Sequence, residues 1–196
     1  MASYKKPRCK QVRRLGLNVY GLPKANRRMT DDASRAHRRL TEYGAQLLEK
    51  QRLRAYYNTS EKQFRSYVEK AKKGDVPTAL GLIRRLEMRL DNLVYRLGFA
   101  TSIFQARQMV VHGHILVDRH KTDRPSYPVS PGQTIALKDK APQLFKDNFT
   151  TAYPASYPYL SKEEAYRGTL KREPDREEIP IEINDPLVVE YYSRIM

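Results

Sequence analysis

Cysteine and long apolar runs are nearly absent from this sequence. Cys9 is the one cysteine among 196 residues, so an internal disulfide and a cysteine cluster that binds zinc are both excluded. A chain without disulfides is typical of a reducing compartment. No run of about 18 apolar residues is present, which excludes a hydrophobic membrane span. The N-terminal residues include no apolar segment, so we expect no secretory signal.

Catalytic signatures are absent as well. The sequence contains no Gly-rich phosphate-binding loop, no nucleophile elbow and no zinc-peptidase motif. His112 and His114 are neighbours, but two histidines without a carboxylate or thiolate at ligand spacing do not define a metal site. We therefore expect no metal and no cofactor, and we favour a binding function over an enzymatic one.

Positive charge is what the sequence has in excess. It contains 37 Lys and Arg against 22 Asp and Glu, a net charge of +15. Such a charge repels itself unless an anionic partner neutralises it, and the phosphates of nucleic acids are the commonest partner. A solvated basic surface without a ligand is the alternative. Residues 1–60 carry 15 basic and 4 acidic residues, whereas residues 151–196 carry 6 and 9, so the N-terminal third is the main electrostatic footprint.

Turn-forming residues and hydrophobic spacing predict the N-terminal elements. Residues 1–40 mix charged and turn-forming residues, which indicates a mostly irregular arm that becomes ordered against a partner. A basic amphipathic helix is predicted over residues 41–57. Its apolar positions are Tyr43, Leu47, Leu48, Tyr56 and Tyr57.

Helical spacing continues after this helix. Ser60 and Gln63 form a candidate capping box for a helix that reaches about Lys72. Leucines at spacings of three and four then predict helix from Pro77 to Gly98, with the glycine as a left-handed stop. This stretch is either one helix or two helices that meet near residue 87.

A further helix and short strands follow. Ser102 with Gln105 predicts a capped helix that ends at Val111. Strands are expected at 115–117, 126–129 and 134–137, with turns at 118–121 and 130–132 between them. The acidic segment 173–182 is interpreted as a solvated or protein-facing surface.

These segments carry a resemblance to a known domain. The residues RLDNLVYRLG at 89–98, QARQMV at 105–110, HGHILVD at 112–118 and YPVSPGQTI at 127–135 resemble the small RNA-binding domain named after ribosomal protein S4. The flanking segments that resemble the ribosomal protein itself are 40–44, 46–47, 49–51, 166–169 and 188–194. The chain is thus similar over nearly its whole length to the uS4 family of small ribosomal subunit proteins, of the bacterial or organellar type.

The chain departs from the family pattern in one place. Many family members carry a cysteine-rich zinc site near the N-terminus, and the solitary Cys9 means that this site is absent here. The arm is then ordered by RNA contacts or by packing. The turn at 118–120 also lacks the glycine of a tight hairpin, so we expect a longer loop there.

The resemblance implies an α+β fold. A mainly helical domain would contain an inserted small αα-β RNA-binding domain, and a basic irregular arm would precede both. We expect the arm at residues 1–40, the discontinuous helical domain at 41–87 with 176–196, and the inserted domain with a C-terminal extension at 88–175. The C-terminal segment would return to the helical domain.

The resemblance also implies a function. The protein would be a structural constituent of the small ribosomal subunit that binds a junction in the 5′ domain of 16S-type ribosomal RNA early in assembly. It would lie where mRNA enters the subunit, beside ribosomal proteins of the uS3 and uS5 types, and would contribute to translational accuracy. We expect a cytoplasmic, ribosome-bound protein, with an organellar ribosome as the alternative and no membrane partner.

Folded RNA is recognised mainly through its shape, phosphates and 2′-hydroxyls, so the candidate contacts are cationic and polar side chains. The candidate RNA-binding residues are Arg13, Arg14, Arg27, Arg28, Arg35, Arg38, Arg39, Lys50, Arg52, Arg54, Arg65, Arg89, Asn92, Arg96, Arg107, Gln108, His112 and His114. Arg89, Asn92 and Arg96 are expected on one helix face, opposite much of its leucine stripe.

Other interpretations stay open at this stage. Tyr56 and Tyr95 either stack on bases or belong to the core. Asp91 faintly resembles the catalytic aspartate of pseudouridine synthases, although an ion pair with a nearby arginine explains it more simply. A free RNA chaperone or a translational repressor would use the same basic surface as a ribosomal protein.

Overall fold

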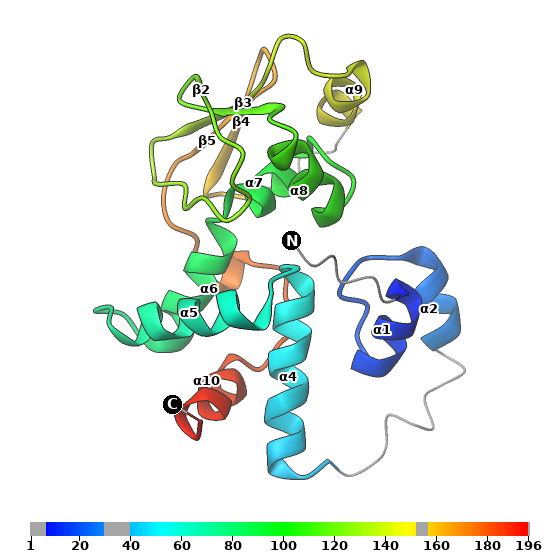
Figure 1. Ribbon diagram of the computed structural model, residues 1–196, viewed down its shortest axis with the longest axis vertical. Helices are drawn as coiled ribbons and strands as arrows, with labels where there is room; N and C mark the ends of the chain where they lie inside the picture. The colour runs from blue at the N-terminus through cyan, green and yellow to red at the C-terminus, as the bar shows by residue number, and fades with distance from the viewer. Residues whose placement is uncertain (1–6, 30–39, 152–156, 196) are drawn as a thin grey trace. The chain divides into compact units, whose positions relative to one another are not determined.

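The computed structural model describes residues 7–29, 40–151 and 157–195. Its elements (Figure 1) are α1 (Arg8–Leu15), α2 (Pro23–Met29), α4 (Glu42–Tyr56), α5 (Glu61–Lys72), α6 (Thr78–Glu87), α7 (Leu90–Arg96), α8 (Ile103–Val111), β1 (Ile115–Val117), β2 (His120–Lys121), β3 (Thr134–Leu137), α9 (Gln143–Thr151), β4 (Leu160–Glu163), β5 (Arg167–Leu170), the 3-10 helix η1 (Arg176–Glu178) and α10 (Asp185–Ser193). Within the described residues, every helix is too short or too polar to cross a lipid bilayer.

The chain forms two compact units. Residues 1–68 and 182–196 make unit 1, and residues 69–181 make unit 2. Helices dominate the first unit, and a small antiparallel sheet with helices forms the second, so the predicted α+β class is confirmed. The domain boundaries expected at residues 40, 87 and 175 stay a prediction.

Two helices lie where an irregular arm was expected. α1 ends at Gly16, whose φ of 63° is the left-handed conformation that closes a helix. Val12, Leu15, Val19 and Ala25 are buried between α1 and α2, which pack on each other. The prediction of an irregular arm is wrong for these two helices, because four scattered apolar residues supply a small core that the surrounding charges and turn formers concealed.

α4 confirms the helix predicted after residue 41, but not its buried face. The Thr41 hydroxyl accepts a hydrogen bond from the Gly44 N–H at 3.1 Å and caps the helix. Tyr43 is 49% exposed, whereas the polar side chains of Gln46, Glu49 and Lys50 are buried. Of the predicted apolar positions, Tyr57 is fully buried and Leu47, Leu48 and Tyr56 are half-buried. The predicted face is therefore wrong at Tyr43, and it omits the buried polar residues.

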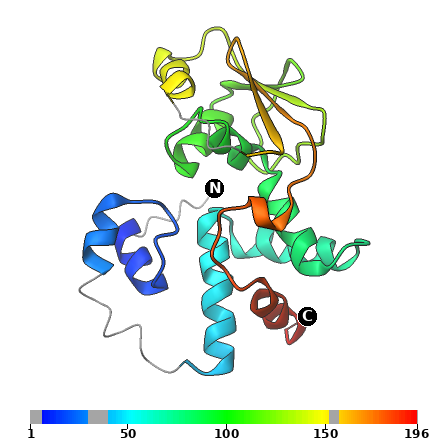
Figure 2. The ribbon, with the colours of Figure 1, turned by 180° about the vertical axis from the view of Figure 1, so that it is seen from behind.

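The partner of this polar face is α10, which lies beside α4 in both views (Figures 1 and 2). Gln46 donates a hydrogen bond to Glu190 at 3.1 Å, and the backbone N–H of Asn184 donates to Glu49 at 3.1 Å. Burial of the Gln46 amide nitrogen and the Glu49 carboxylate is tolerated here because both have hydrogen-bond partners on the returning segment. The expected return of the C-terminal segment to the helical part is confirmed.

The helical predictions at 60–72 and 77–98 are also confirmed. The Ser60 hydroxyl accepts from the Gln63 N–H at 3.3 Å, and α5 begins at the next residue. The chain then breaks into α6 and α7 because Arg89 takes an extended conformation with ψ 140°. The question of one helix or two is thus decided in favour of two. Gly98 stops α7 with φ 83°.

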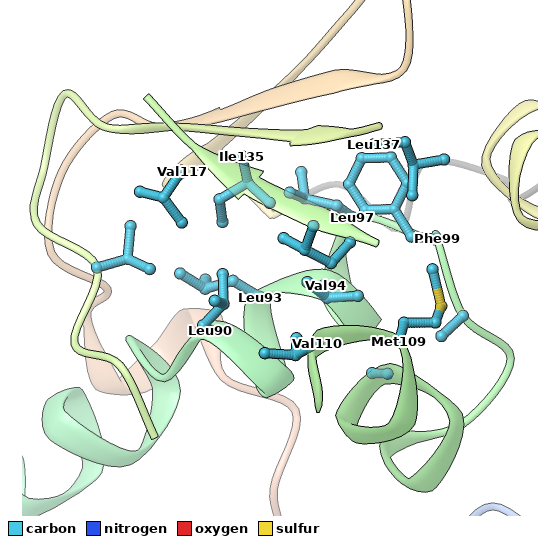
Figure 3. Close-up of a cluster of buried hydrophobic side chains, with 14 of the residues drawn as sticks. Leu90, Leu93, Val94, Leu97, Phe99, Met109, Val110, Val117, Ile135 and Leu137 are labelled. Atoms are coloured by element: carbon cyan, nitrogen blue, oxygen red, sulfur yellow. The ribbon is translucent and has the colours of Figure 1, made fainter. Parts of the chain in front are cut away.

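Unit 2 is organised around a five-stranded antiparallel sheet of order β2-β1-β3-β5-β4. α7 and α8 pack against it, and Leu93, Val94 and Leu97 of α7 lie in one buried cluster with Ile135 and Leu137 of β3 (Figure 3). The predicted helix from Ser102 is confirmed as α8, and the predicted strands at 115–117 and 134–137 are confirmed as β1 and β3.

Two features of the sheet differ from expectation. Residues 126–129 form a single bridge between Pro128 and Arg89 rather than a strand, so that prediction is wrong. Their backbone instead follows the α6–α7 junction, where the Leu90 N–H donates to Tyr127 O at 3.0 Å. β4 and β5 were not predicted, because their sequences, LSKE and RGTL, lack the valine, isoleucine and aromatic residues typical of strands.

One glycine of β5 sets the distance between sheet and helix. Gly168 is buried, and a Cβ atom built there would lie 2.4 Å from Leu97 Cδ2 and 3.1 Å from Ser161 O. Gly168→Ala is therefore expected to lower the free energy of unfolding by about 1–3 kcal/mol, the usual cost of overpacking. Urea unfolding would measure this. Gly74→Ala is the control, since its Cβ would meet only Ala71 O at 3.5 Å; equal effects of both changes would contradict the close packing.

Candidate nucleic-acid interface

A buried network of charges surrounds the start of α7. Arg89 is 1% exposed, and its guanidinium donates two hydrogen bonds to the Asp91 carboxylate, from Nε at 2.9 Å and from Nη2 at 2.6 Å. The Asn92 N–H donates to the same carboxylate at 3.0 Å, and Arg107 Nη1 lies 3.9 Å from it. Asp91 is therefore paired with Arg89, lies near Arg107 and accepts a backbone N–H in the first turn of α7, which supports the structural interpretation of this residue.

A second buried carboxylate lies one helix earlier. Glu87 is fully buried and accepts from Arg96 Nε at 2.7 Å and from the Tyr159 hydroxyl at 2.8 Å. The Asn92 side chain donates to the Glu87 backbone oxygen at 2.8 Å. Burial, followed by the negative charge of Glu87, raises the pKa of Tyr159 well above its ordinary value of 10.0, so this phenol stays protonated and donates.

This network changes the picture of three candidate residues. Arg89, Asn92 and Arg96 were expected on an exposed face of the helix, and that expectation is wrong, since all three are buried with partners inside the protein. The reason is that α8 and the sheet pack on α7, and that Glu87 and Asp91 supply the negative charges that balance the two arginines. Their contact with RNA stays a prediction that nothing in the fold favours.

Removing one partner of a buried pair leaves a charge without compensation. Asp91→Ala is expected to destabilise unit 2 by about 3–5 kcal/mol, because Arg89 would stay buried without the carboxylate that balances its charge. Denaturant unfolding monitored by circular dichroism measures this. The control is Asp123→Ala at an exposed position, where we expect a change within roughly 0.5 kcal/mol. A small effect for Asp91→Ala would contradict the importance of the pair.

Exposed polar and cationic groups gather at the end of α8. Arg107 is partly exposed, and Gln108 and His112 are exposed. Gly113 follows with φ 70°, and a Cβ there would lie 2.5 Å from Lys121 Cε, so the Lys121 side chain covers the glycine. The β1–β2 hairpin thereby adds its cations to those of the helix. The α8–hairpin surface, as we name it, consists of Arg107, Gln108, His112, Arg119, His120 and Lys121.

The hairpin is tighter than expected. Val117 pairs with His120, which leaves only Asp118 and Arg119 in the loop, with φ values of 48° and 69°. Two consecutive positive φ values are typical of the type I′ turn, which aspartate tolerates almost as well as glycine or asparagine. The Asp118 carboxylate also accepts from the Thr134 N–H at 2.9 Å and from Gln133 Nε2 at 2.7 Å. The prediction of a longer loop is therefore wrong.

Three hairpin residues were missed as candidates. Arg119, His120 and Lys121 are exposed, and none was among the candidate contacts. His120 and Lys121 pair with β1, and the Lys121 side chain lies against Gly113 at the end of α8. The signal was the Asp-Arg pair after an apolar strand, which sequence analysis interpreted as a long loop instead of a turn.

The candidate cations of unit 1 divide into exposed and engaged groups. Arg13 and Arg14 on α1 and Arg65 on α5 are exposed. Arg52 Nε donates to Leu15 O at 2.8 Å, which places a cation at the C-terminal end of α1, the favourable end of the helix dipole. Arg27 and Arg28 lie on α2, but their side chains, like Arg35, Arg38 and Arg39, lie outside the described residues.

Lys50 and Arg54 share one carboxylate. Lys50 is 4% exposed, and its Nζ lies 3.0 Å from Glu61 and 4.5 Å from the centre of the Tyr191 ring. Arg54 Nη1 lies 3.0 Å from the same carboxylate. Burial alone would raise the pKa of Glu61, but hydrogen bonds from Tyr192 and Lys50 and the two positive charges hold it below 4.5. Lys50 is thus a buried structural cation.

The remaining interpretations concern tyrosines and acids. Tyr95 is half-buried against the unit 2 core, and Tyr56 is half-buried with its ring 5.1 Å from that of the fully buried Tyr57. Both positions favour a core role.

In the acidic segment, Arg84 donates to Glu173 at 2.9 Å and to Asp175 at 3.0 Å, so part of this segment is neutralised within unit 2.

A pocket of about 230 Å³ lies beside the α8–hairpin surface. It is lined by Gln105, Gln108, Met109, His112, His114 and Phe145, and we name it the α8–α9 pocket. The rings of His112 and His114 are 6.2 Å apart, but no group of three metal-binding side chains occurs in the described ranges. The geometry therefore gives no support to a metal at this histidine pair.

His114 is electrostatically distinct. Burial, and then the positive charges of His112 and Lys138, lower the pKa of His114 below 6.5, so the ring is neutral at pH 7. Lys138→Gln should raise this pKa, because one repelling charge is removed. An NMR titration of the imidazole protons measures the shift, with Lys72→Gln as the control. No difference between the two variants would contradict the electrostatic cause.

Comparison with known proteins gives a consistent picture. Residues 3–87 match the family described as Ribosomal protein S4/S9 N-terminal domain, and residues 88–135 match the family described as S4 domain. The chain is 56% identical to the small ribosomal subunit protein uS4 of Finegoldia magna over 198 residues, which span 99% of this chain and 100% of that protein. It is also 47% identical to the small ribosomal subunit protein uS4B of Clostridium acetobutylicum and 44% identical to uS4 of Brevibacillus brevis. Both matches span 99% of this chain and 100% of the relative.

Proposed function

The chain belongs to the uS4 family of small ribosomal subunit proteins, which are structural and not enzymatic, and on this premise we propose that it binds small-subunit ribosomal RNA through the α8–hairpin surface. The observation that carries the proposal is the gathering of exposed cations on two elements held by a buried core. A fixed set of cations suits a folded RNA, whose phosphates follow a fixed curved path.

The proposal extends to the site of binding. The RNA is a junction in the 5′ domain of 16S-type ribosomal RNA, and binding there nucleates assembly of the subunit. Exposed Arg13, Arg14 and Arg65 of unit 1 supply further phosphate contacts. Arg89, Asn92, Arg96 and Lys50 are assigned a supporting role instead, since they are buried. Residues 88–175 act as the inserted RNA-binding domain in this proposal.

The finer details of location follow from the same family membership. We propose that the protein lies where mRNA enters the subunit, in contact with ribosomal proteins of the uS3 and uS5 types, and that it contributes to translational accuracy. The ribosomes concerned are cytoplasmic in this proposal, and organellar ribosomes are the alternative. Neutron or cryo-electron microscopy positions in the assembled subunit would test each of these contacts.

Footprinting on small-subunit ribosomal RNA tests the main proposal. Protection should be confined to one junction of the 5′ domain. If about six phosphates are neutralised, the affinity should fall by roughly a thousandfold between about 50 and 200 mM salt. Diffuse protection with equal affinity for any RNA would indicate a nonspecific chaperone instead, and a nearly flat salt dependence would exclude the electrostatic part.

A single substitution probes the surface itself. Arg107→Ala should weaken binding to the junction by about three- to tenfold and reduce the salt slope by about one, because one phosphate contact is lost. Filter binding in a salt series measures both quantities. Lys72→Ala, a change of an exposed cation on α5, is the control. If the two variants bind alike, the α8–hairpin surface is not the contact.

A further inference from the structure

The α8–α9 pocket has the size and lining of a site for one planar group. Its volume of about 230 Å³ is below the roughly 300–1,000 Å³ of clefts that hold drug-sized molecules. The lining combines a buried thioether, Met109, with the rings of Phe145 and His114, which meet edge to face with centres 5.4 Å apart. A flat ring in this pocket would have both apolar atoms and amide groups among its lining residues.

One hydrogen-bonding group in the pocket, the Gln105 amide, is held in place. The Gln105 side-chain oxygen accepts from the Thr101 N–H and hydroxyl, both at 2.8 Å, and this fixes the amide. Its Nε2 is left as the donor that Gln105 offers to a ligand. Gln108 and His112 add side chains that both donate and accept. A purely apolar occupant would bury these groups without partners, whereas the edge of a nucleobase carries acceptors and donors.

The surroundings favour a ligand on an anionic chain. No carboxylate lines the pocket, and Lys138 and His112 are close enough to His114 to lower its pKa. Gln108 and His112 belong both to the pocket and to the α8–hairpin surface. A phosphate backbone that crosses that surface would therefore bring a base to the pocket. Stacking on aromatic rings is how proteins hold unpaired bases of RNA.

We propose that the α8–α9 pocket binds a single unpaired nucleobase of the RNA. This inference rests on the proposed function, because it assigns a base contact to the same RNA. The pocket would be a second kind of contact beside the phosphate contacts. It requires that one nucleotide of the target RNA is unstacked. Binding would then depend on a bulged or looped base as well as on the shape of the junction.

A substitution that fills the pocket tests the proposal. Gln108→Trp places an indole at an exposed lining position, and Gln143→Trp on α9 is the matched control outside the lining. For Gln108→Trp we expect about ten- to a hundredfold weaker binding to the 5′-domain RNA, the loss of one stacked base. Chemical probing of the bound RNA should show one unpaired nucleotide that regains reactivity. Phe145→Leu, which removes the ring and keeps the apolar volume, should weaken binding as well.

The outcomes separate this proposal from the proposed function. If the wild-type protein and both tryptophan variants bind the RNA equally with the same probing pattern, the pocket does not hold a base, although RNA binding stands. If the variants bind RNA normally but Gln108→Trp fails to enter reconstituted subunits, the pocket takes a protein side chain and the proposal is overturned.

A second measurement does not require the ribosomal RNA. NMR signals of the Phe145 and His114 rings should shift when adenosine or uridine monophosphate is added to the wild-type protein, and not when ribose 5-phosphate is added. This result would support the pocket even if specific RNA binding failed. Equal shifts with ribose 5-phosphate, or none with either nucleotide, would overturn the proposal.

Discussion

Two buried carboxylates at the ends of α6 and α7 determine how unit 2 is built. Glu87 binds Arg96, the Tyr159 hydroxyl and, through its backbone oxygen, Asn92, while Asp91 binds Arg89. A buried charge is tolerated only when its partners are held close to it. The Glu87 contacts therefore hold α7 and the segment at Tyr159 against the end of α6. The apolar cluster between α7, α8 and β3 packs beside these ion pairs (Figure 3).

A fixed backbone beneath the solvent-facing cations affects how much entropy they lose on binding. Long cationic side chains lose conformational entropy when they bind, and less is lost when their backbone is already held. The end of α8 and the hairpin are joined by the contact of Lys121 with Gly113 and by β1 pairing. Cations spaced in this way match a rigid anionic partner better than a flexible arm of the same charge.

Local patterns predicted α4, α5, α6, α7 and α8, the caps at Ser60 and Ser102 and the strands β1 and β3, because these depend on spacing and capping between near neighbours in the sequence. They did not predict α9 or α10. They did not predict the polar face of α4, whose partner α10 lies more than a hundred residues away. Nor did they predict that Arg89 and Arg96 are buried, since charge in a sequence indicates exposure unless the countercharge is known. The pocket was missed because Phe145 joins His114 only after β3 has brought α9 beside α8.

The pairing of α4 with α10 also affects the order in which the chain folds. All of unit 2, from residue 69 to 181, is one continuous stretch, whereas α10 is synthesised only after that stretch is complete. Gln46 and Glu49 therefore lack their hydrogen-bond partners on the C-terminal segment until that segment is made. The inserted unit can form its own core before then. Synthesis from the N-terminus therefore allows the sheet of unit 2 to form first, and unit 1 is the part of the nascent chain that stays incomplete longest.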